Sequence, residues 1–107
     1  MVRRGSLYWA QLPGDAGRRP VCVLTRDGAI GSLTSVTCAP LTRTIRGIKS
    51  EVLLDEDDGL PSLCVISCDN IATIPMISID PAPIAHLSVE RQFELDRAIR
   101  FALNVSD

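Results

Sequence analysis

The sequence predicts a mainly β domain that ends in one helix, folded as a small and strongly bent β-barrel. Two observations support this class. Short apolar runs recur between residues 5 and 74, separated by segments rich in glycine, proline and aspartate. The only convincing apolar stripe with helical spacing follows Ser88, near the C-terminus. Several short strands with one terminal helix are typical of such a barrel.

The predicted strands follow from local apolar patterns. Residues 5–11 alternate around Leu7 and Trp9, as in a strand with one buried face. Residues 21–25 form a continuous apolar run, which is typical of a strand buried on both faces. Further strands are predicted over residues 33–41, 51–54, 62–67 and 70–74.

The connecting segments and the helix have their own signals. Residues 13–17 are a turn-rich loop, Asp27-Gly28 is a turn, and residues 42–50 lack apolar periodicity and are expected to be a loop. Ser88 is a good N-cap for the terminal helix. The apolar stripe of that helix consists of Leu95, Ala98, Ile99, Ala102 and Leu103.

Length and composition fit one domain over residues 1–107. Apolar residues make up 46% of the chain but only four are aromatic, so the core is expected to be mainly aliphatic. No apolar run approaches the roughly 20 residues that span a bilayer. The basic start, Met1-Val2-Arg3-Arg4, is not followed by the apolar segment of a secretory signal. We therefore expect a cytoplasmic protein without a membrane association.

Charge is distributed unevenly along the chain. The formal net charge is −2, which alone argues against a general nucleic-acid binder. Residues 1–50, however, hold eight basic and two acidic side chains, whereas residues 51–107 hold three basic and eleven acidic ones. Two interpretations remain open. The loops at 13–19 and 43–50 form a basic patch, or their charges are simply solvated.

The four cysteines are interpreted as buried apolar side chains. Cys22, Cys38, Cys64 and Cys68 include no Cys-x-x-Cys pair, and three of them lie in β-rich apolar runs. This spacing favours packing over zinc binding, and disulfides are not expected without export. We expect no metal and no cofactor. Histidine is a common proton-transfer group, but a surface or structural role is favoured for His86.

Two polar residues flank neighbouring predicted strands. Arg19 comes just before one strand and Thr42 just after the next. If these strands are neighbours, the two side chains project into a common space. A guanidinium beside a hydroxyl suits a phosphodiester, because both groups bind its non-bridging oxygens. On this pattern alone, a salt-bridged loop arginine and a threonine that caps a turn at a strand end are the favoured interpretations.

An ordered set of short motifs runs through the chain. They are Arg4-Gly5-Ser6-Leu7-Tyr8-Trp9, Gly17-Arg18-Arg19-Pro20-Val21-Cys22-Val23, Pro40-Leu41-Thr42, Gly59-Leu60, Asp69-Asn70-Ile71-Ala72-Thr73-Ile74 and Leu87-Ser88. In this order the set resembles the MazF/PemK/Kid family, the endoribonuclease toxins of bacterial type II toxin–antitoxin systems.

The resemblance implies a fold, an activity and partners. The fold is the small SH3-like (CcdB/PemK-type) barrel, and the working unit is a homodimer. The activity is that of a metal-independent, sequence-specific mRNA interferase, which cleaves single-stranded RNA by attack of a 2′-hydroxyl on the adjacent phosphate. The family's catalytic arginine corresponds to Arg19 and its catalytic threonine to Thr42. The second partner is a cognate antitoxin whose C-terminal segment is acidic and disordered.

The resemblance also has departures. An Arg-Cys-Asp triplet of the Kid branch here reads Ser67-Cys68-Asp69, so the carboxylate is kept and the arginine is lost. Asp69 is the candidate general base, although it also fits turn chemistry. RNA contacts are expected from the loops at 13–18 and 43–50. The candidate RNA-binding residues there are Arg18, Arg43, Arg46 and Lys49.

An alternative function shares the same fold. A CcdB-like gyrase poison, or a non-catalytic barrel that binds an antitoxin or its operator, cannot be separated by fold alone. The Arg19 and Thr42 pair distinguishes them, because a gyrase poison has no need of it. A generic β-barrel adaptor is the least favoured interpretation.

Overall fold

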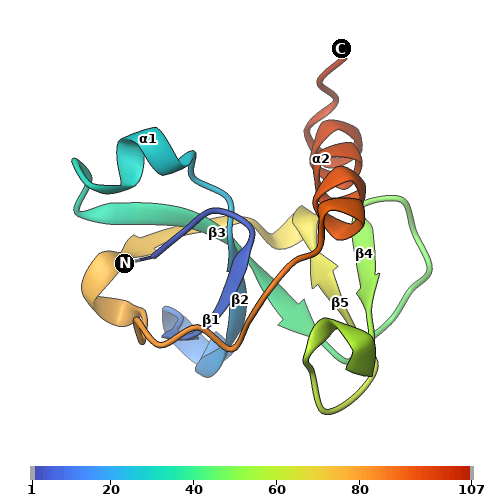
Figure 1. The fold of residues 1–107 in the computed structure, drawn as a ribbon, viewed down its shortest axis with the longest axis horizontal. Coiled ribbons are helices and arrows are strands. Elements are labelled where there is room, and N and C mark those ends of the chain that lie inside the picture. Colours follow the sequence, from blue (N-terminus) through green and yellow to red (C-terminus); the bar gives the residue numbers. More distant parts are fainter. Residues whose placement is uncertain (1, 107) are drawn as a thin grey trace.

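The computed structural model describes residues 2–106. The chain forms a strongly bent antiparallel sheet followed by one long helix (Figure 1). The strands are β1 (Ser6–Gln11), β2 (Arg18–Val23), β3 (Ser35–Thr42), β4 (Glu51–Leu54), β5 (Cys64–Ser67), β6 (Ala72–Pro75) and β7 (Ala85–His86). The α-helices are α1 (Asp27–Ile30) and α2 (Val89–Leu103), and the 3₁₀ turns are η1 (Gly14–Ala16), η2 (Glu56–Asp58), η3 (Cys68–Asn70) and η4 (Met76–Ser78).

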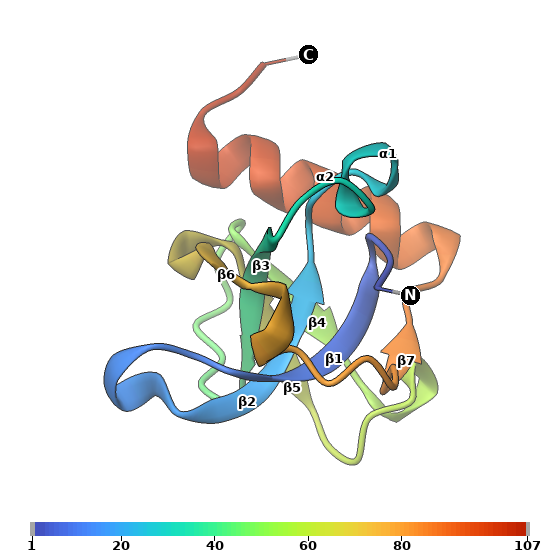
Figure 2. The same ribbon diagram turned by 90° about the vertical axis from the view of Figure 1, so that its left-hand side faces the viewer.

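Strand β3 holds the sheet together. The strand order is β4-β5-β3-β2-β1-β7, and β6 pairs with β3 outside this path. The first part of β3 pairs with β6 and then with β2, whereas its last two residues pair with β5. Changing partners along one strand bends the sheet, and in Figure 2 β1 and β2 form a long curled hairpin whose loop extends away from the other strands.

The two faces of the sheet bury separate apolar clusters. Leu7 and Cys22 lie in one cluster with Leu95 of α2, so this helix covers one face. Tyr8 and Val21 lie in the other. The continuous apolar run in β2 is therefore buried on both sides, as predicted, and residues 21–23 have no exposed surface.

The predicted fold class is confirmed: the chain is mainly β with a C-terminal helix, and the barrel takes the form of a half-barrel sheet. Asp27-Gly28, predicted as a turn, instead begins the short helix α1, because the buried Ala29 and Ile30 hold this segment against the core. Strand β7 was not predicted. It is only two residues long and depends on pairing with β1, which local patterns do not report.

Helix α2 begins and ends as its sequence indicates. The Ser88 hydroxyl accepts a hydrogen bond from the Arg91 N–H at 3.1 Å, which confirms the predicted N-cap. Asn104 ends the helix in the left-handed conformation, with φ of 55°. Leu95 and Ala98 are buried as expected. Leu103 was assigned to the apolar stripe, but it is 57% exposed because it lies in the last turn, beyond the sheet.

The cysteines are buried and uncharged. All four are free thiols inside the apolar clusters, as predicted for packing residues. Burial raises the pKa of Cys22 to about 12, and burial raises the pKa of Cys38 and of Cys68 to about 11. Between residues 2 and 106, no three His, Cys, Asp or Glu side chains are grouped as metal ligands. No helix in this part of the chain has the length and apolar character needed to cross a bilayer.

An ion-pair cluster ties α2 to the turn η2. Arg91 Nε donates to Asp58 Oδ1 at 3.2 Å, and its terminal nitrogens contact Glu94 and Asp55 at 3.1 and 3.6 Å. Only 8% of the Asp58 side chain is exposed. Desolvation alone would raise the pKa of Asp58, but hydrogen bonds from the Asp55 backbone N–H and from Arg91, with the charge of Arg91, outweigh it and lower the pKa.

Removing this arginine should destabilise the fold in a pH-dependent way. Arg91→Ala is expected to lower the free energy of unfolding at pH 7 by about 1.5–3 kcal/mol, the range for hydrogen bonds to charged groups. The pKa of Asp58 is lower in the folded state than its ordinary value of 3.8. The ionised carboxylate therefore makes its full contribution to the free energy of unfolding above pH 3.8, and this contribution is lost as the pH falls through the lowered pKa. Urea titrations of wild type and variant at neutral and acidic pH measure both effects.

Arg97→Ala is the matched control, because Arg97 is an exposed arginine on the same helix. It should change the free energy of unfolding by much less than Arg91→Ala. A difference between wild type and Arg91→Ala that stays constant down to strongly acidic pH would contradict the role assigned to Asp58.

Candidate active site

The site lies where strands β2 and β3 part. Their ladder runs from Val23 paired with Cys38 to Val21 paired with Pro40. Beyond Pro40, β3 pairs with β5 instead. Proline has no N–H to donate, and Pro20 and Pro40 both lie at this end of the ladder. We call the opening between the two strands, from Arg19 to Thr42, the fork.

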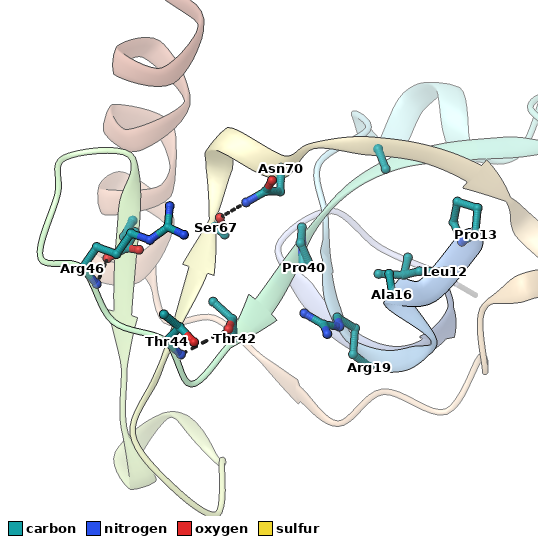
Figure 3. Close-up of a pocket in the computed structure, with 12 residues that line it drawn as sticks. Leu12, Pro13, Ala16, Arg19, Pro40, Thr42, Thr44, Arg46, Ser67 and Asn70 are labelled. Carbon is teal, nitrogen blue, oxygen red and sulfur yellow. Dashed lines mark hydrogen bonds between the residues drawn. The ribbon is translucent and has the colours of Figure 1, made fainter.

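Register brings Arg19 and Thr42 together at the fork. Continuing the β2–β3 pairing by two residues beyond Val21 and Pro40 sets Arg19 opposite Thr42. Side chains two residues apart in a strand point to the same face, so both project to one side of the sheet. In Figure 3 Arg19 and Thr42 face one another across a cavity of about 400 Å³. This loop pocket is lined by Leu12, Pro13, Ala16, Arg19, Pro40, Thr42, Thr44, Arg46, Glu51, Ser67, Asn70 and Ala72.

Arg19 has an unmet hydrogen-bonding requirement. Its side chain is half-buried, and its Nε is buried without a hydrogen-bond partner. Within residues 2–106, no carboxylate forms an ion pair with it, so the salt-bridged alternative does not describe this arginine. A buried donor without a partner costs free energy, and a bound anion would supply the missing acceptor.

Thr42 is oriented by the turn that follows it. Its hydroxyl oxygen accepts a hydrogen bond from the Thr44 backbone N–H at 3.1 Å. Threonine therefore does cap a turn here, as one interpretation held. The capping bond uses a lone pair and leaves the hydroxyl proton available to donate to a ligand in the pocket.

Glu51 is the carboxylate that lines the loop pocket. Its Oε1 accepts hydrogen bonds from the backbone N–H groups of Arg46 and Gly47, both at 3.0 Å. Gly47 has φ of 69°, a left-handed conformation that glycine adopts at little cost. The carboxylate thus holds the loop at residues 43–50 in place beside the pocket.

Asp69 occupies a different environment. It lies in η3, where its Oδ2 accepts a hydrogen bond from Ser50 Oγ at 2.5 Å, and it does not line the loop pocket. Its neighbours Ser67 and Asn70 do line it, joined by a 2.7 Å hydrogen bond. Asp69 is the candidate general base from the sequence, but the carboxylate that lines the loop pocket is that of Glu51. The sequence signal missed was a glutamate at the end of the loop that begins at Thr42.

The four candidate RNA-binding residues are not all on one surface. Arg46 lines the loop pocket, while Arg18 and Arg43 line a second cavity of about 320 Å³ on the other side of the fork. The Lys49 ammonium lies 5.8 Å from the ring centroid of Phe101, against α2. The second cavity, here the tryptophan pocket, is lined by Trp9, Arg18, Arg19, Pro20, Leu41, Thr42, Arg43, Leu60, Pro61, Ser62, Cys64 and Ile84.

The charges around the fork favour an anionic ligand. Four arginines line the two pockets, whereas Glu51 is the only acidic side chain among the described lining residues. The interpretation of a basic patch at residues 13–19 and 43–50 is therefore supported, except at Lys49. Of the described acidic side chains in the second half of the sequence, Asp55, Asp58 and Glu94 pair with Arg91, whereas Asp80 lies 3.8 Å from Arg18.

Comparison with known proteins identifies the family. The model of the PemK-like, MazF-like toxin of type II toxin–antitoxin systems matches residues 3–103. The chain is 41% identical over 100 residues to a protein of Mycobacterium tuberculosis named probable endoribonuclease MazF2. The matched region covers 92% of this chain and 95% of that protein. The chain therefore belongs to the PemK-like, MazF-like toxin family.

Solved structures share the fold. The Mycobacterium tuberculosis toxin MazF-mt6 superposes with a TM-score of 0.87 at 37% identity, covering 95% of this chain and 99% of that one. A mycobacterial endoribonuclease in complex with its cognate antitoxin superposes with a TM-score of 0.86 over 100% of this chain and 99% of that one. Its sequence identity is 20%, so it supports the fold alone.

Replacing Glu51 should release the loop. Glu51→Ala is expected to speed hydrogen exchange of the Arg46 and Gly47 amides about tenfold, because their shared charged acceptor is lost. Site-resolved hydrogen exchange by NMR measures this. Glu56→Ala is a matched control, since Glu56 is an exposed glutamate in η2, outside both pockets. Unchanged exchange at both amides in Glu51→Ala would contradict the proposed restraint.

Proposed function

We propose that this member of the toxin family is a metal-independent, sequence-specific endoribonuclease that cleaves single-stranded RNA through attack of a ribose 2′-hydroxyl on the adjacent phosphate. The observation that carries this proposal is the fork, where Arg19 and Thr42 face one another across an open cavity and the Arg19 Nε is left without a hydrogen-bond partner. The name of the relative that is 41% identical, probable endoribonuclease MazF2, supports the same reaction class.

Arg19 would stabilise the charge that develops on the reacting phosphate. In-line attack by the 2′-hydroxyl adds negative charge to the non-bridging oxygens, and a guanidinium offers them two parallel donors. The missing partner of Nε would be one of these oxygens. Arginine remains protonated at neutral pH, so it is suited to hold charge or to protonate the leaving 5′-oxygen, not to act as a resting base.

Thr42 would orient the phosphate from the opposite side of the fork. Its hydroxyl oxygen accepts a hydrogen bond from the Thr44 N–H, so the turn fixes the position of the hydroxyl group. With Arg19 donating from β2 and Thr42 from β3, the reacting phosphate of the RNA would lie between the two strands. Positioning of this kind raises the rate because the bound geometry need not be found by diffusion.

Proton acceptance from the 2′-hydroxyl requires a base. We propose Glu51 for this role in preference to Asp69, because Glu51 lines the loop pocket and the Asp69 carboxylate is engaged by Ser50 outside it. The two Glu51 hydrogen bonds to the loop both use Oε1, and its second oxygen is available to accept a proton.

The RNA chain would follow the arginines across the fork. Arg46 reaches the loop pocket from the side opposite Arg19 (Figure 3), and Arg18 and Arg43 continue the positive surface into the tryptophan pocket. Loops that carry these arginines are also suited to read splayed bases, which is how most sequence-specific RNA recognition works.

Two protein partners are part of the proposal. We infer a cognate antitoxin whose acidic, disordered C-terminal segment lies over the same arginines and excludes RNA. We also infer a homodimer. Exposed apolar side chains along α2 and just after it, at Val89, Phe93, Phe101, Leu103 and Val105, support an interface with a second copy.

The alternative function is a CcdB-like gyrase poison or a barrel that only binds an antitoxin or operator. Neither would need a donor pair aimed into an open cavity, and cleavage of RNA separates them from the proposal. Incubating the purified protein with several long single-stranded RNAs in EDTA should give discrete fragments that end at one short sequence. Intact RNA in every case would favour the alternative.

Arg19→Ala should abolish most of the cleavage without unfolding the protein. Loss of a preorganised donor at developing charge costs about 10²–10³ in rate. Arg19→Lys should recover little, because an ammonium cannot copy the planar fork of a guanidinium. Single-turnover cleavage in EDTA measures the rate, and circular dichroism checks the fold. Cleavage at the wild-type rate by Arg19→Ala would show that the active site has been misassigned.

Salt dependence should separate RNA binding from chemistry. Arg46→Ala is expected to flatten the log–log slope of affinity against salt by roughly 0.7, the value for one phosphate contact to a single strand. Thr42→Ala should instead lower the single-turnover rate at saturating RNA and keep the slope. Lys49→Ala is the comparison variant, with a smaller expected change because its ammonium lies against Phe101. An unaltered slope in Arg46→Ala would place the RNA path away from this loop.

A further inference from the structure

The tryptophan pocket lies on the same face of the sheet as the apolar cluster that α2 covers, beyond the end of that cluster. Trp9 pairs with Pro20 across β1 and β2, and the next pair on the same face, Leu7 with Cys22, is fully buried. The indole of Trp9, in contrast, is 41% exposed. Apolar side chains of Leu60 and Ile84 line the same cavity. A flat aromatic ring is thus left open to solvent in an otherwise apolar recess.

Cations border this recess. The Arg18 guanidinium lies 5.4 Å from the ring centroid of Trp9, within the range of a cation–π contact. It also lies 3.8 Å from the carboxylate of Asp80. Arg43, just beyond the end of β3, also lines the cavity, and no carboxylate does so in the described part of the chain. An aromatic wall with guanidinium groups at its rim suits a flat ring that is attached to a phosphate.

The recess adjoins the proposed reaction centre. Arg19 and Thr42 line both pockets, so these two residues form a boundary that the pockets share. A phosphate held between Arg19 and Thr42 has a nucleoside on each side. One of these two neighbouring bases is therefore within reach of the tryptophan pocket.

We propose that the tryptophan pocket takes up one nucleobase next to the scissile phosphate, stacked against Trp9 and bordered by Arg18 and Arg43. This inference rests on the proposed function and adds a subsite to it. An apolar side chain of a protein partner is the other conceivable occupant. The guanidinium rim and the shared boundary with the phosphate site favour the base.

The protein contains a single tryptophan, so its fluorescence reports on this pocket alone. Wild type is first used to map the cleaved sequence. A short oligonucleotide of that sequence, with a 2′-O-methyl group at the attacking position to block cleavage, is then titrated against the protein. It should quench the fluorescence. Two further oligonucleotides carry an abasic nucleotide on one side or the other of the scissile phosphate. One of these two changes should remove the quenching and weaken binding about tenfold.

Substitution at Trp9 completes the cycle. Trp9→Leu should bind the intact oligonucleotide about tenfold more weakly than wild type. Its affinity should be the same for the intact and the abasic oligonucleotide, whereas Trp9→Phe should still bind the intact one somewhat more tightly. Binding of both variants is followed with a labelled oligonucleotide. Ile77→Ala is the control, since Ile77 is 91% exposed and lines neither pocket. It should bind as wild type does.

The outcomes separate the two proposals. If wild type cleaves no RNA, the proposed function fails and the subsite fails with it. If wild type cleaves but the intact oligonucleotide leaves the fluorescence unchanged, or if neither abasic position matters, only the subsite is overturned. Quenching by an acidic antitoxin peptide but not by the oligonucleotide would assign the pocket to a protein partner. Should Trp9→Leu fail to fold, Trp9→Phe and the abasic comparison on wild type still decide the question.

Discussion

The change of partner along β3 is the constraint on which the rest of the molecule depends. The ladder between β2 and β3 ends at the pair Val21 and Pro40, and β3 pairs with β5 from Leu41 onward. The sheet bends there, an opening forms between Arg19 and Thr42, and the loops on either side of it reach the same space. Fold and site are therefore consequences of a single feature of the backbone.

The fork contains a buried polar atom without a hydrogen-bond partner, the Nε of Arg19, which the remaining structure must tolerate. An arginine Nε buried without an acceptor opposes folding. Stability comes from elsewhere, from apolar clusters on both faces of the sheet and from the Arg91 ion pairs that attach α2 to η2. Keeping such a donor unpaired in the free protein makes sense if a phosphate is bound there, since the donor then needs no rearrangement to meet developing charge.

Local patterns predicted most of the fold but only part of the site. Strands β1 to β6, the cap at Ser88 and the buried cysteines follow from short-range periodicity and composition. Arg19 and Thr42 were found because they match a family motif and were expected to flank two neighbouring strands. The structure places Arg19 within β2 and Thr42 at the end of β3, because both strands extend further than the apolar runs that predicted them. Glu51 was missed because its place depends on pairing with Ser67 across β4 and β5, a register that residues 43–51 do not encode locally. Lys49 points to Phe101 for a similar reason, since the position of α2 is set by the core.

The division of charge along the sequence becomes a division in space. Most of the described acidic side chains of the second half lie on η2, α2 and the exposed turns, where Arg91 pairs with three of them. Among the described residues, Glu51 is the one carboxylate that lines the loop pocket. That one carboxylate accepts two backbone hydrogen bonds from the loop that carries Arg46. A protein of net charge −2 can therefore present a positive surface to RNA, because the binding surface and the net charge are set by different parts of the fold.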